Sequence, residues 1–143
     1  MLKKIIIGVV GLMIIGGAIV YFMTENAAKL TEYELSGDKV ASVNAVIGEE
    51  RKVIRVSKSI GVGQKQYTYE SASVTKDLAM YTTHLRNNGW IVTKSYDFST
   101  GSGEAQLGIE SIEKGQILLM SIAFELNKYA IKITKAKGQL DRK

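Results

Sequence analysis

The 143-residue chain contains no cysteine and a single histidine. The absence of cysteine excludes a disulfide framework, thiolate metal sites, a catalytic thiol and lipid attachment through an N-terminal cysteine. It is compatible with either redox compartment, so it does not locate the protein. With one histidine, a zinc site would need carboxylates for most of its ligands, and no calcium-loop motif is present. The sequence therefore predicts neither a metal nor a cofactor.

The single histidine, His84, falls in a segment that we expect to be helical, at the border of its apolar stripe. We interpret it as a boundary residue between core and solvent. The alternative is a hydrolase of the cell envelope that uses His84 as its general base, although the sequence motif for such an enzyme is weak. A general base at this position requires an orienting carboxylate and a cleft. Glu49 and Glu50 fall in an expected turn, and strand geometry places Glu110 and Glu113 on opposite faces. We therefore expect no catalysis.

Charge is missing from residues 5–23, a run of 19 residues without an Asp, Glu, Lys, Arg or His. As a helix this run is roughly 28 Å long, close to the hydrocarbon thickness of about 30 Å. Lys3 and Lys4 precede it and Glu25 is the first charge after it, so the positive-inside rule keeps the N-terminus in the cytoplasm. The sequence predicts a single-pass protein of the cell membrane with an extracytoplasmic C-terminal domain.

Two alternatives to an uncut anchor stay open. The small residues at 16–18 offer a signal-peptide cleavage near Ala18, which would release a secreted protein. The short basic head ending at Gly8 resembles a pilin-type leader, but Met13 stands where such leaders carry glutamate. In each case the domain is exported. The glycines of the run include no pair four residues apart, so we interpret it as an anchor and not as a helix-pairing segment.

The chain divides into five expected segments. They are a cytoplasmic basic head at 1–4, a transmembrane signal-anchor helix at 5–23, a polar stalk at 24–37, an exported α+β domain at 38–137 and a basic tail at 138–143. Residues 24–50 hold two basic and six acidic residues, whereas residues 51–143 hold fifteen basic and eight acidic. The positive excess favours an anionic partner, although a solvated lysine-rich face has the same composition.

Residues 73–89 carry the pattern of an amphipathic helix. Ser73 suits the N-cap, and Gly89 suits the left-handed position after the last turn, with Trp90 completing a Schellman motif. The apolar stripe recurs at spacings of three and four residues and consists of Val74, Leu78, Tyr81 and Leu85.

Alternating apolar residues predict strands on both sides of this helix. We interpret residues 39–60 as a hairpin that turns at 48–50, followed by a short strand with Tyr67 and Tyr69 on one face. Both tyrosines should pack in the core with their hydroxyl groups reaching water. Four further strand-like runs follow, at 90–98, 104–112, 116–126 and 129–135. Their short connections indicate an antiparallel meander.

The predicted order is β-β-(β)-α-β-β-β-β. The fold class is α+β: an N-terminal transmembrane helix, then one α-helix packed on a twisted antiparallel sheet. In the last strand, alternation turns Tyr129, Ile131 and Ile133 inward and Lys128, Lys132 and Thr134 outward. This pattern favours an edge position or a sheet with one wet side, and such an edge could accept a partner strand.

The candidate interaction surface has two parts. The first is a basic edge suited to lipid headgroups or anionic wall polymers, formed by Lys128, Lys132, Lys135 and Lys137 and continued by Arg142 and Lys143. The second is the glycine-rich tip with Ser99, Gly101 and Gly103, because loop tips often contact partners. The expected partners are the membrane and a protein or envelope component. Nucleic acid is not expected, since no reader motif occurs.

Overall fold

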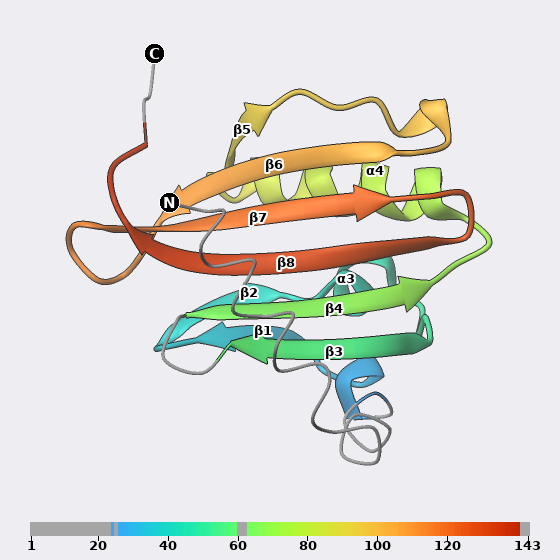
Figure 1. The fold of residues 1–143 in the computed structure, drawn as a ribbon, viewed down its shortest axis with the longest axis horizontal. Coiled ribbons are helices and arrows are strands. Elements are labelled where there is room, and N and C mark those ends of the chain that lie inside the picture. The colour runs from blue at the N-terminus through green and yellow to red at the C-terminus, as the bar shows by residue number, and fades with distance from the viewer. Residues whose placement is uncertain (1–23, 25, 60–62, 141–143) are drawn as a thin grey trace.

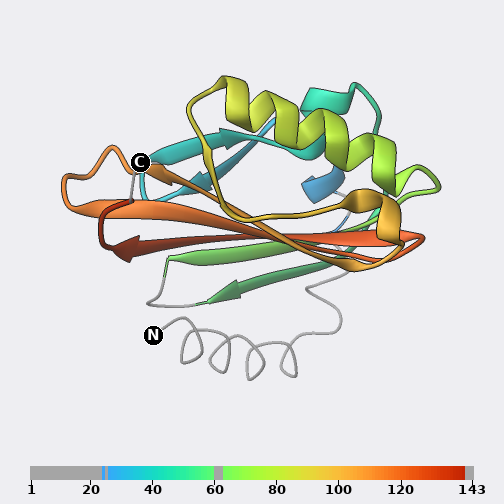
Figure 2. The same cartoon turned by 90° about the horizontal axis from the view of Figure 1, so that it is seen from above.

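A six-stranded antiparallel sheet forms one layer of the fold, and two helices with a small hairpin form the other (Figure 1, Figure 2). The computed structural model describes residues 24, 26–59 and 63–140. The basic head at 1–4, the anchor segment at 5–23, the cleavage position near Ala18 and the tail residues Arg142 and Lys143 lie outside the described residues. Within the described part, the α+β class predicted from the sequence is confirmed.

From α4 onward the elements follow the predicted order, but the described part before α4 contains one more helix and one more strand than predicted. The elements are β1 (Glu32–Leu35), β2 (Asp38–Ala41), α3 (Val43–Ile47), β3 (Val53–Ser59), β4 (Gln64–Glu70), α4 (Val74–Asn87), β5 (Ile91–Lys94), the 3-10 turn η1 (Phe98–Thr100), β6 (Gly103–Glu110), β7 (Gln116–Phe124) and β8 (Lys128–Lys137). β1 pairs with β2, and the main sheet has the order β3-β4-β8-β7-β6-β5. The last four strands form the predicted meander.

β8 lies in the middle of the sheet and not at its edge. β4 pairs with β8 on one side along its whole length, and β7 pairs on the other side. The predicted edge position of residues 129–135 is therefore wrong. β7 pairs with one side of β8, as the meander requires, and β4 pairs with the other side. Thr134, expected on the wet side, is 2% exposed, whereas Ile131 and Ile133 face the core as predicted.

The segment expected to be a polar stalk contains β1. Tyr33 and Leu35 are 1% and 5% exposed, so this segment contributes to the core. Alternation along β1 buries every second side chain and leaves both glutamates at the surface. The chain reverses at Ser36 and Gly37, which both have positive φ, and returns antiparallel as β2. The structure thus replaces the predicted stalk with a hairpin that belongs to the domain.

Residues 43–47 form the short helix α3, although their alternation predicted a strand. Ser42 caps this helix, because its Oγ accepts a hydrogen bond from the Ala45 N–H at 3.1 Å. Gly48 ends the helix with φ of 72°. The hairpin predicted over 39–60 is therefore wrong: β2 pairs with β1, and β3 pairs with β4. A strong cap outweighed a short alternating pattern.

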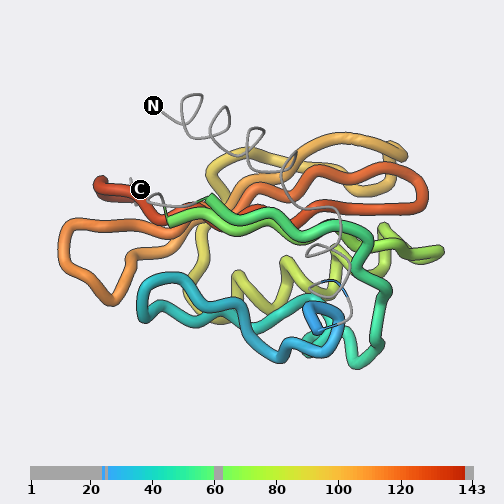
Figure 3. The backbone as a smooth tube through the Cα atoms, turned by 60° about the horizontal axis from the view of Figure 1, so that its bottom comes forward, coloured from blue at the N-terminus to red at the C-terminus, as the bar shows by residue number. Residues whose placement is uncertain are grey.

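The helix predicted from the sequence is confirmed as α4, which buries the predicted stripe. The N–H of Trp90 donates to the Leu85 carbonyl at 3.1 Å and the N–H of Gly89 donates to the Arg86 carbonyl at 3.2 Å. These two bonds, with φ of 95° at Gly89, form the predicted Schellman motif. α4, α3 and the β1–β2 hairpin all lie over the same face of the sheet (Figure 2, Figure 3).

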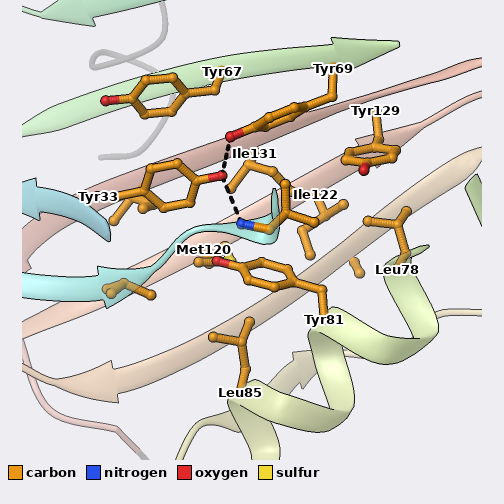
Figure 4. Packing of buried hydrophobic residues seen from close by; sticks show 14 of the residues in the cluster. Tyr33, Tyr67, Tyr69, Leu78, Tyr81, Leu85, Met120, Ile122, Tyr129 and Ile131 are labelled. Carbon is orange, nitrogen blue, oxygen red and sulfur yellow. Dashed lines mark hydrogen bonds between the residues drawn. The ribbon is translucent and has the colours of Figure 1, made fainter. Parts of the chain in front are cut away.

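Tyrosines fill much of the core between the two layers (Figure 4). The buried ones are Tyr33, Tyr67, Tyr69, Tyr81 and Tyr129. The hydroxyls of Tyr33 and Tyr69 hydrogen-bond to each other, and the Tyr81 hydroxyl donates to the Ala41 carbonyl at 2.8 Å. The prediction that the Tyr69 hydroxyl reaches water is therefore wrong, because a partner inside the core satisfies it.

Candidate functional site

The sheet face opposite α4, called here the outer face, is a candidate binding surface. No described helix or strand covers it, and Leu140 approaches it at one corner, beside Gly108 (Figure 1, Figure 2). Four half-buried side chains cross it in register, one from each of β4, β8, β7 and β6: Gln66, Lys132, Ser121 and Gln106. We call these four residues the polar row.

The polar row is partly held by its own hydrogen bonds. Gln106 Nε2 donates to Ser121 Oγ at 3.4 Å, and Thr93 Oγ1 donates to Gln106 Oε1 at 2.8 Å. The neighbouring in-register positions on β8 and β7 carry Ala130 and Ala123, which keep the surface flat beside the row. The outer face therefore offers amide, hydroxyl and ammonium groups on a flat, fixed support.

Lys132 is the charged member of the polar row. It lies on the central strand β8, between Gln66 and Ser121. In the described part of the chain no carboxylate forms an ion pair with it. Its ammonium group is thus available to an anionic group of a partner, and of the predicted lysines it is the one placed at the centre of a surface.

Lys135 does not belong to an exposed basic edge. Its side chain is 4% exposed, and its Nζ lies 2.9 Å from Asp38 Oδ2 and 2.8 Å from Glu113 Oε1. It also donates to the Ser36 carbonyl at 3.1 Å. The hydrogen bond with Glu113 raises the pKa of Lys135, and Asp38 adds to this effect. The predicted place of Lys135 in an exposed basic edge is wrong, since its ammonium group joins the N-terminal hairpin to the sheet.

The remaining two lysines stand far apart. Lys128 and Lys137 occupy opposite ends of β8, about 30 Å from each other along the strand. Lys128 is exposed and lies 3.4 Å from Glu125 in an ion pair, and Lys137 is exposed opposite Gln116. The four predicted lysines therefore do not form one continuous edge.

The glycine-rich tip is a hydrogen-bonded 3-10 turn. The N–H of Ser99 donates to Asp97 Oδ1 at 3.0 Å, so Ser99 is tied to its own loop. Gly103 faces Phe124 across the ladder, and a Cβ there would lie 3.0 Å from the ring. Gly101 lines a cavity of about 290 Å³ beside the start of α4, together with the exposed Leu126. The hydrogen bond to Asp97 accounts for Ser99, and packing against the Phe124 ring accounts for Gly103. Gly101 lies at the surface, beside the cavity.

A buried polar cluster, not predicted from the sequence, surrounds Asp77 in the first turn of α4. Asp77 is 2% exposed and accepts hydrogen bonds from Arg51 Nε at 2.9 Å, Arg51 Nη2 at 3.0 Å, Ser71 Oγ at 2.7 Å and Tyr129 Oη at 3.0 Å. Burial alone would raise the pKa of Asp77, but these hydrogen bonds outweigh it and hold the pKa below its ordinary value. A fully bonded carboxylate stabilises the fold and offers no free acid or base.

His84 is half-buried on α4, at the boundary position predicted for it. In the described ranges no carboxylate is paired with its ring. The described residues likewise contain no group of three or more acidic, histidine or cysteine side chains placed to hold a metal ion. Of the predicted lysines, Lys132 is the one that the structure places in the middle of the outer face.

Comparison with protein-family models, with curated proteins and with solved structures finds no match for this chain. Among the described residues, which begin after the apolar segment, no helix has the length and apolar character needed to cross a membrane.

Proposed function

We propose that this chain is a single-pass membrane-anchored protein whose extracytoplasmic domain binds a protein or an anionic envelope component, without catalysis. Residues 5–23 supply the anchor, and Lys3 and Lys4 keep the N-terminus in the cytoplasm. The outer face of the sheet is the binding surface. The observation that carries the proposal is the polar row, which crosses in register a sheet face that no described helix or strand covers.

The composition of this face favours a binding role over simple solvation. Solvated protein surfaces are rich in charged side chains, whereas three of the four residues in the polar row are uncharged and half-buried. Interface centres are depleted of charge and keep hydrogen-bonding groups that a partner can match. Gln66, Ser121 and Gln106 provide such groups: Ser121 and Gln106 lie one strand spacing apart, about 4.8 Å, and Gln66 and Ser121 lie two spacings apart, about 9.6 Å, with Lys132 between them.

Charge supports an acidic partner. Lys132 stands inside the polar row, and Arg55 is exposed on β3 opposite Thr68. Residues 51–143 carry fifteen basic and eight acidic side chains, so the domain as a whole attracts anions. An anionic group that reaches Lys132 would exchange water for a charge-assisted hydrogen bond, which is stronger than a neutral one.

The binding face is tested by photo-crosslinking in intact cells that produce the full chain. A photoreactive amino acid replaces Ser121 in the polar row, and the matched control replaces the exposed Thr83 on α4. A covalent adduct from position 121 and not from position 83 is the expected result. Equal adducts from both positions, or none from position 121, would overturn the proposed face.

The anchor is tested separately with reporter fusions. A reporter fused after Lys143 should be active only outside the cytoplasm, and a protease added to intact cells should degrade the domain. A reporter that is active in the cytoplasm at this position contradicts the predicted orientation, because residues 24–143 would then lie on the inner side.

A further inference from the structure

We infer that the β3 edge of the sheet rests on the anionic surface of a lipid bilayer. This edge is a second surface, distinct from the polar row, and the inference rests on the proposed anchor. Its residues are Lys52, Ile54, Arg55 and Lys58, with Lys29 and Leu30 from the adjoining segment. The partner is identified by chemistry: phosphate headgroups for the basic side chains and the headgroup–acyl boundary for the apolar ones.

The chain between the anchor and the domain is short. Ala27 is 4% exposed, the Ala28 carbonyl accepts from Asn44 Nδ2 at 2.9 Å, and the Leu30 carbonyl accepts from Ser42 Oγ at 2.6 Å. The chain is therefore fixed to the domain from residue 27 onward. Three residues lie between Met23, the end of the apolar run, and position 27, and the four Cα-to-Cα steps span about 14 Å when extended and about 6 Å as a helix.

This tether brings the domain to the headgroups. The headgroup layer of one leaflet is about 6 Å thick, so even an extended tether keeps residue 27 within about 8 Å of the bilayer surface. That distance equals the Debye length of about 8 Å at physiological salt, within which charges still act on each other. The domain cannot move away from the bilayer as it could on a 14-residue stalk.

The segment that emerges from the anchor packs along β3. Leu30, Val56 and Lys58 line one cavity of about 240 Å³ at this side of the sheet, and the helical turn at 26–28 lies beside β3 (Figure 1). Among the described strands, β3 has β4 as its single neighbour, so it is an edge strand. The β3 edge is therefore the side of the domain that faces the anchor.

The side chains of this edge suit an anionic bilayer. Residues 51–65 contain five basic residues and no acidic one. Four of these five lie outside the Asp77 cluster, and Lys52, Arg55 and Lys58 are exposed. Ile54 and Leu30 are 39% and 37% exposed and add apolar area next to the charges. The exposed acids Glu49 and Glu50 stand before this stretch, so the positive field is centred on Arg55 and Lys58.

The same edge is poorly suited to a partner strand. The ladder between β3 and β4 is irregular between Val53 and Arg55, and Arg55 and Lys58 place two exposed charges on this seven-residue strand. Bulges and charged side chains are the features by which edge strands resist pairing with another chain. These observations favour headgroups over strand addition.

The experiment uses the full chain, inserted in vesicles that contain phosphatidylglycerol and a headgroup-labelled nitroxide lipid. Because the chain has no cysteine, one introduced cysteine carries a fluorophore at Ile54→Cys, and the matched control is Val92→Cys on the opposite edge strand β5. The two side chains are 39% and 42% exposed, and five strand spacings, about 24 Å, separate the edges. Strong quenching at position 54 and weak quenching at position 92 are expected.

Charge reversal separates edge contact from anchoring. In the Ile54→Cys chain, Arg55→Glu with Lys58→Glu should lower the ratio of docked to undocked domain by at least about 25-fold, since each basic residue near an anionic surface contributes about fivefold. The control pair Arg86→Glu with Lys94→Glu makes the same charge change away from β3, at two exposed positions, and should leave quenching at position 54 unchanged.

Each remaining outcome overturns the inference in a recognisable way. Equal quenching at positions 54 and 92 in protein that resists alkaline extraction overturns the β3 edge and leaves the anchor intact. Complete extraction of the full chain overturns the anchor and, with it, the edge. Protection of position 54 in native membranes but not in lipid vesicles would assign the edge to a protein partner.

Discussion

Lys135 Nζ and Asp38 Oδ2 lie 2.9 Å apart with both side chains nearly buried, and they join the central strand β8 to the N-terminal hairpin. Asp38 also accepts hydrogen bonds from Ser111 Oγ at 2.6 Å and from the N–H of Ile112 at 2.9 Å. One carboxylate thus connects three parts of the chain that are distant in sequence. The β1–β2 hairpin is fixed to the sheet by charge as well as by the burial of Tyr33 and Leu35.

Lys135→Met should destabilise the domain because it leaves Asp38 buried without its counter-charge. Lys137→Met, two residues further along the same strand, removes an exposed lysine and should have little effect. Urea unfolding of both variants provides the comparison, with a lower midpoint and an unchanged slope expected for Lys135→Met. Equal midpoints for the two variants would show that the buried pair contributes nothing.

The domain should lose stability in acid through Asp77. Its folded-state pKa is held below the ordinary value of about 3.9, so its contribution is fully present above about pH 4 and is lost as pH falls through the folded-state pKa. Asp77→Asn should lower stability at neutral pH and make the acid side of the stability curve shallower. Urea unfolding at a series of pH values measures both effects. A curve parallel to that of the unchanged protein would contradict the assignment.

Tyr81→Phe should cost about 1 to 3 kcal/mol of unfolding free energy, because it leaves the Ala41 carbonyl without its buried donor. Tyr96→Phe is the matched control, since Tyr96 is half-buried and stacks on Phe98 through its ring, which the substitution keeps. The control should change stability by less than about 0.5 kcal/mol. The free energies come from chemical denaturation of the two variants under one set of conditions.

Lys132→Glu should abolish the adduct formed from position 121 while leaving stability within about 0.5 kcal/mol, because Lys132 has a half-exposed side chain and no ion pair among the described residues. Lys128→Glu makes the same charge change at the end of β8. Adduct yield and the urea midpoint are measured for each variant. If both variants lose the adduct equally, net charge and not the polar row governs binding.

An uncut anchor predicts that the chain in the membrane fraction keeps its full mass of 15.7 kDa. Cleavage near Ala18 would instead give a shorter chain outside the cells. Intact-mass spectrometry of membrane and secreted fractions distinguishes the two forms. This measurement also bears on the β3 edge, which requires the short connection between the anchor and Ala27.

Local patterns were enough to predict several elements correctly. The stripe of α4 and the Schellman motif at Gly89 depend on residues within one or two turns of each other, so the sequence contains all the information that they need. The meander of the last four strands follows from alternation and short connections in the same way. Alternation also predicted correctly that Lys132 faces away from the core side of β8, opposite Ile131 and Ile133.

Other predictions failed where the outcome depended on distant partners. Val43 alternates with its neighbours like a strand residue, but the cap from Ser42 starts a helix there. Tyr33 looked like part of a polar linker, because its partner Tyr69 is far along the chain. Lys135 was predicted to be exposed for the same reason: no local pattern reveals Asp38 as its neighbour.

The sequence by itself determined the helix, the strands of the meander, the α+β class and the expectation of a membrane anchor, since these depend on the spacing and polarity of nearby residues. Only the tertiary structure decided which strand lies at the edge. Because β4 pairs with β8, the polar row lies at the centre of the outer face and β3 is left at the edge of the sheet. Lys135 is buried because the N-terminal hairpin brings Asp38 against it. Strand pairing over long separations is set by the packing of the whole core, which no short stretch of sequence encodes.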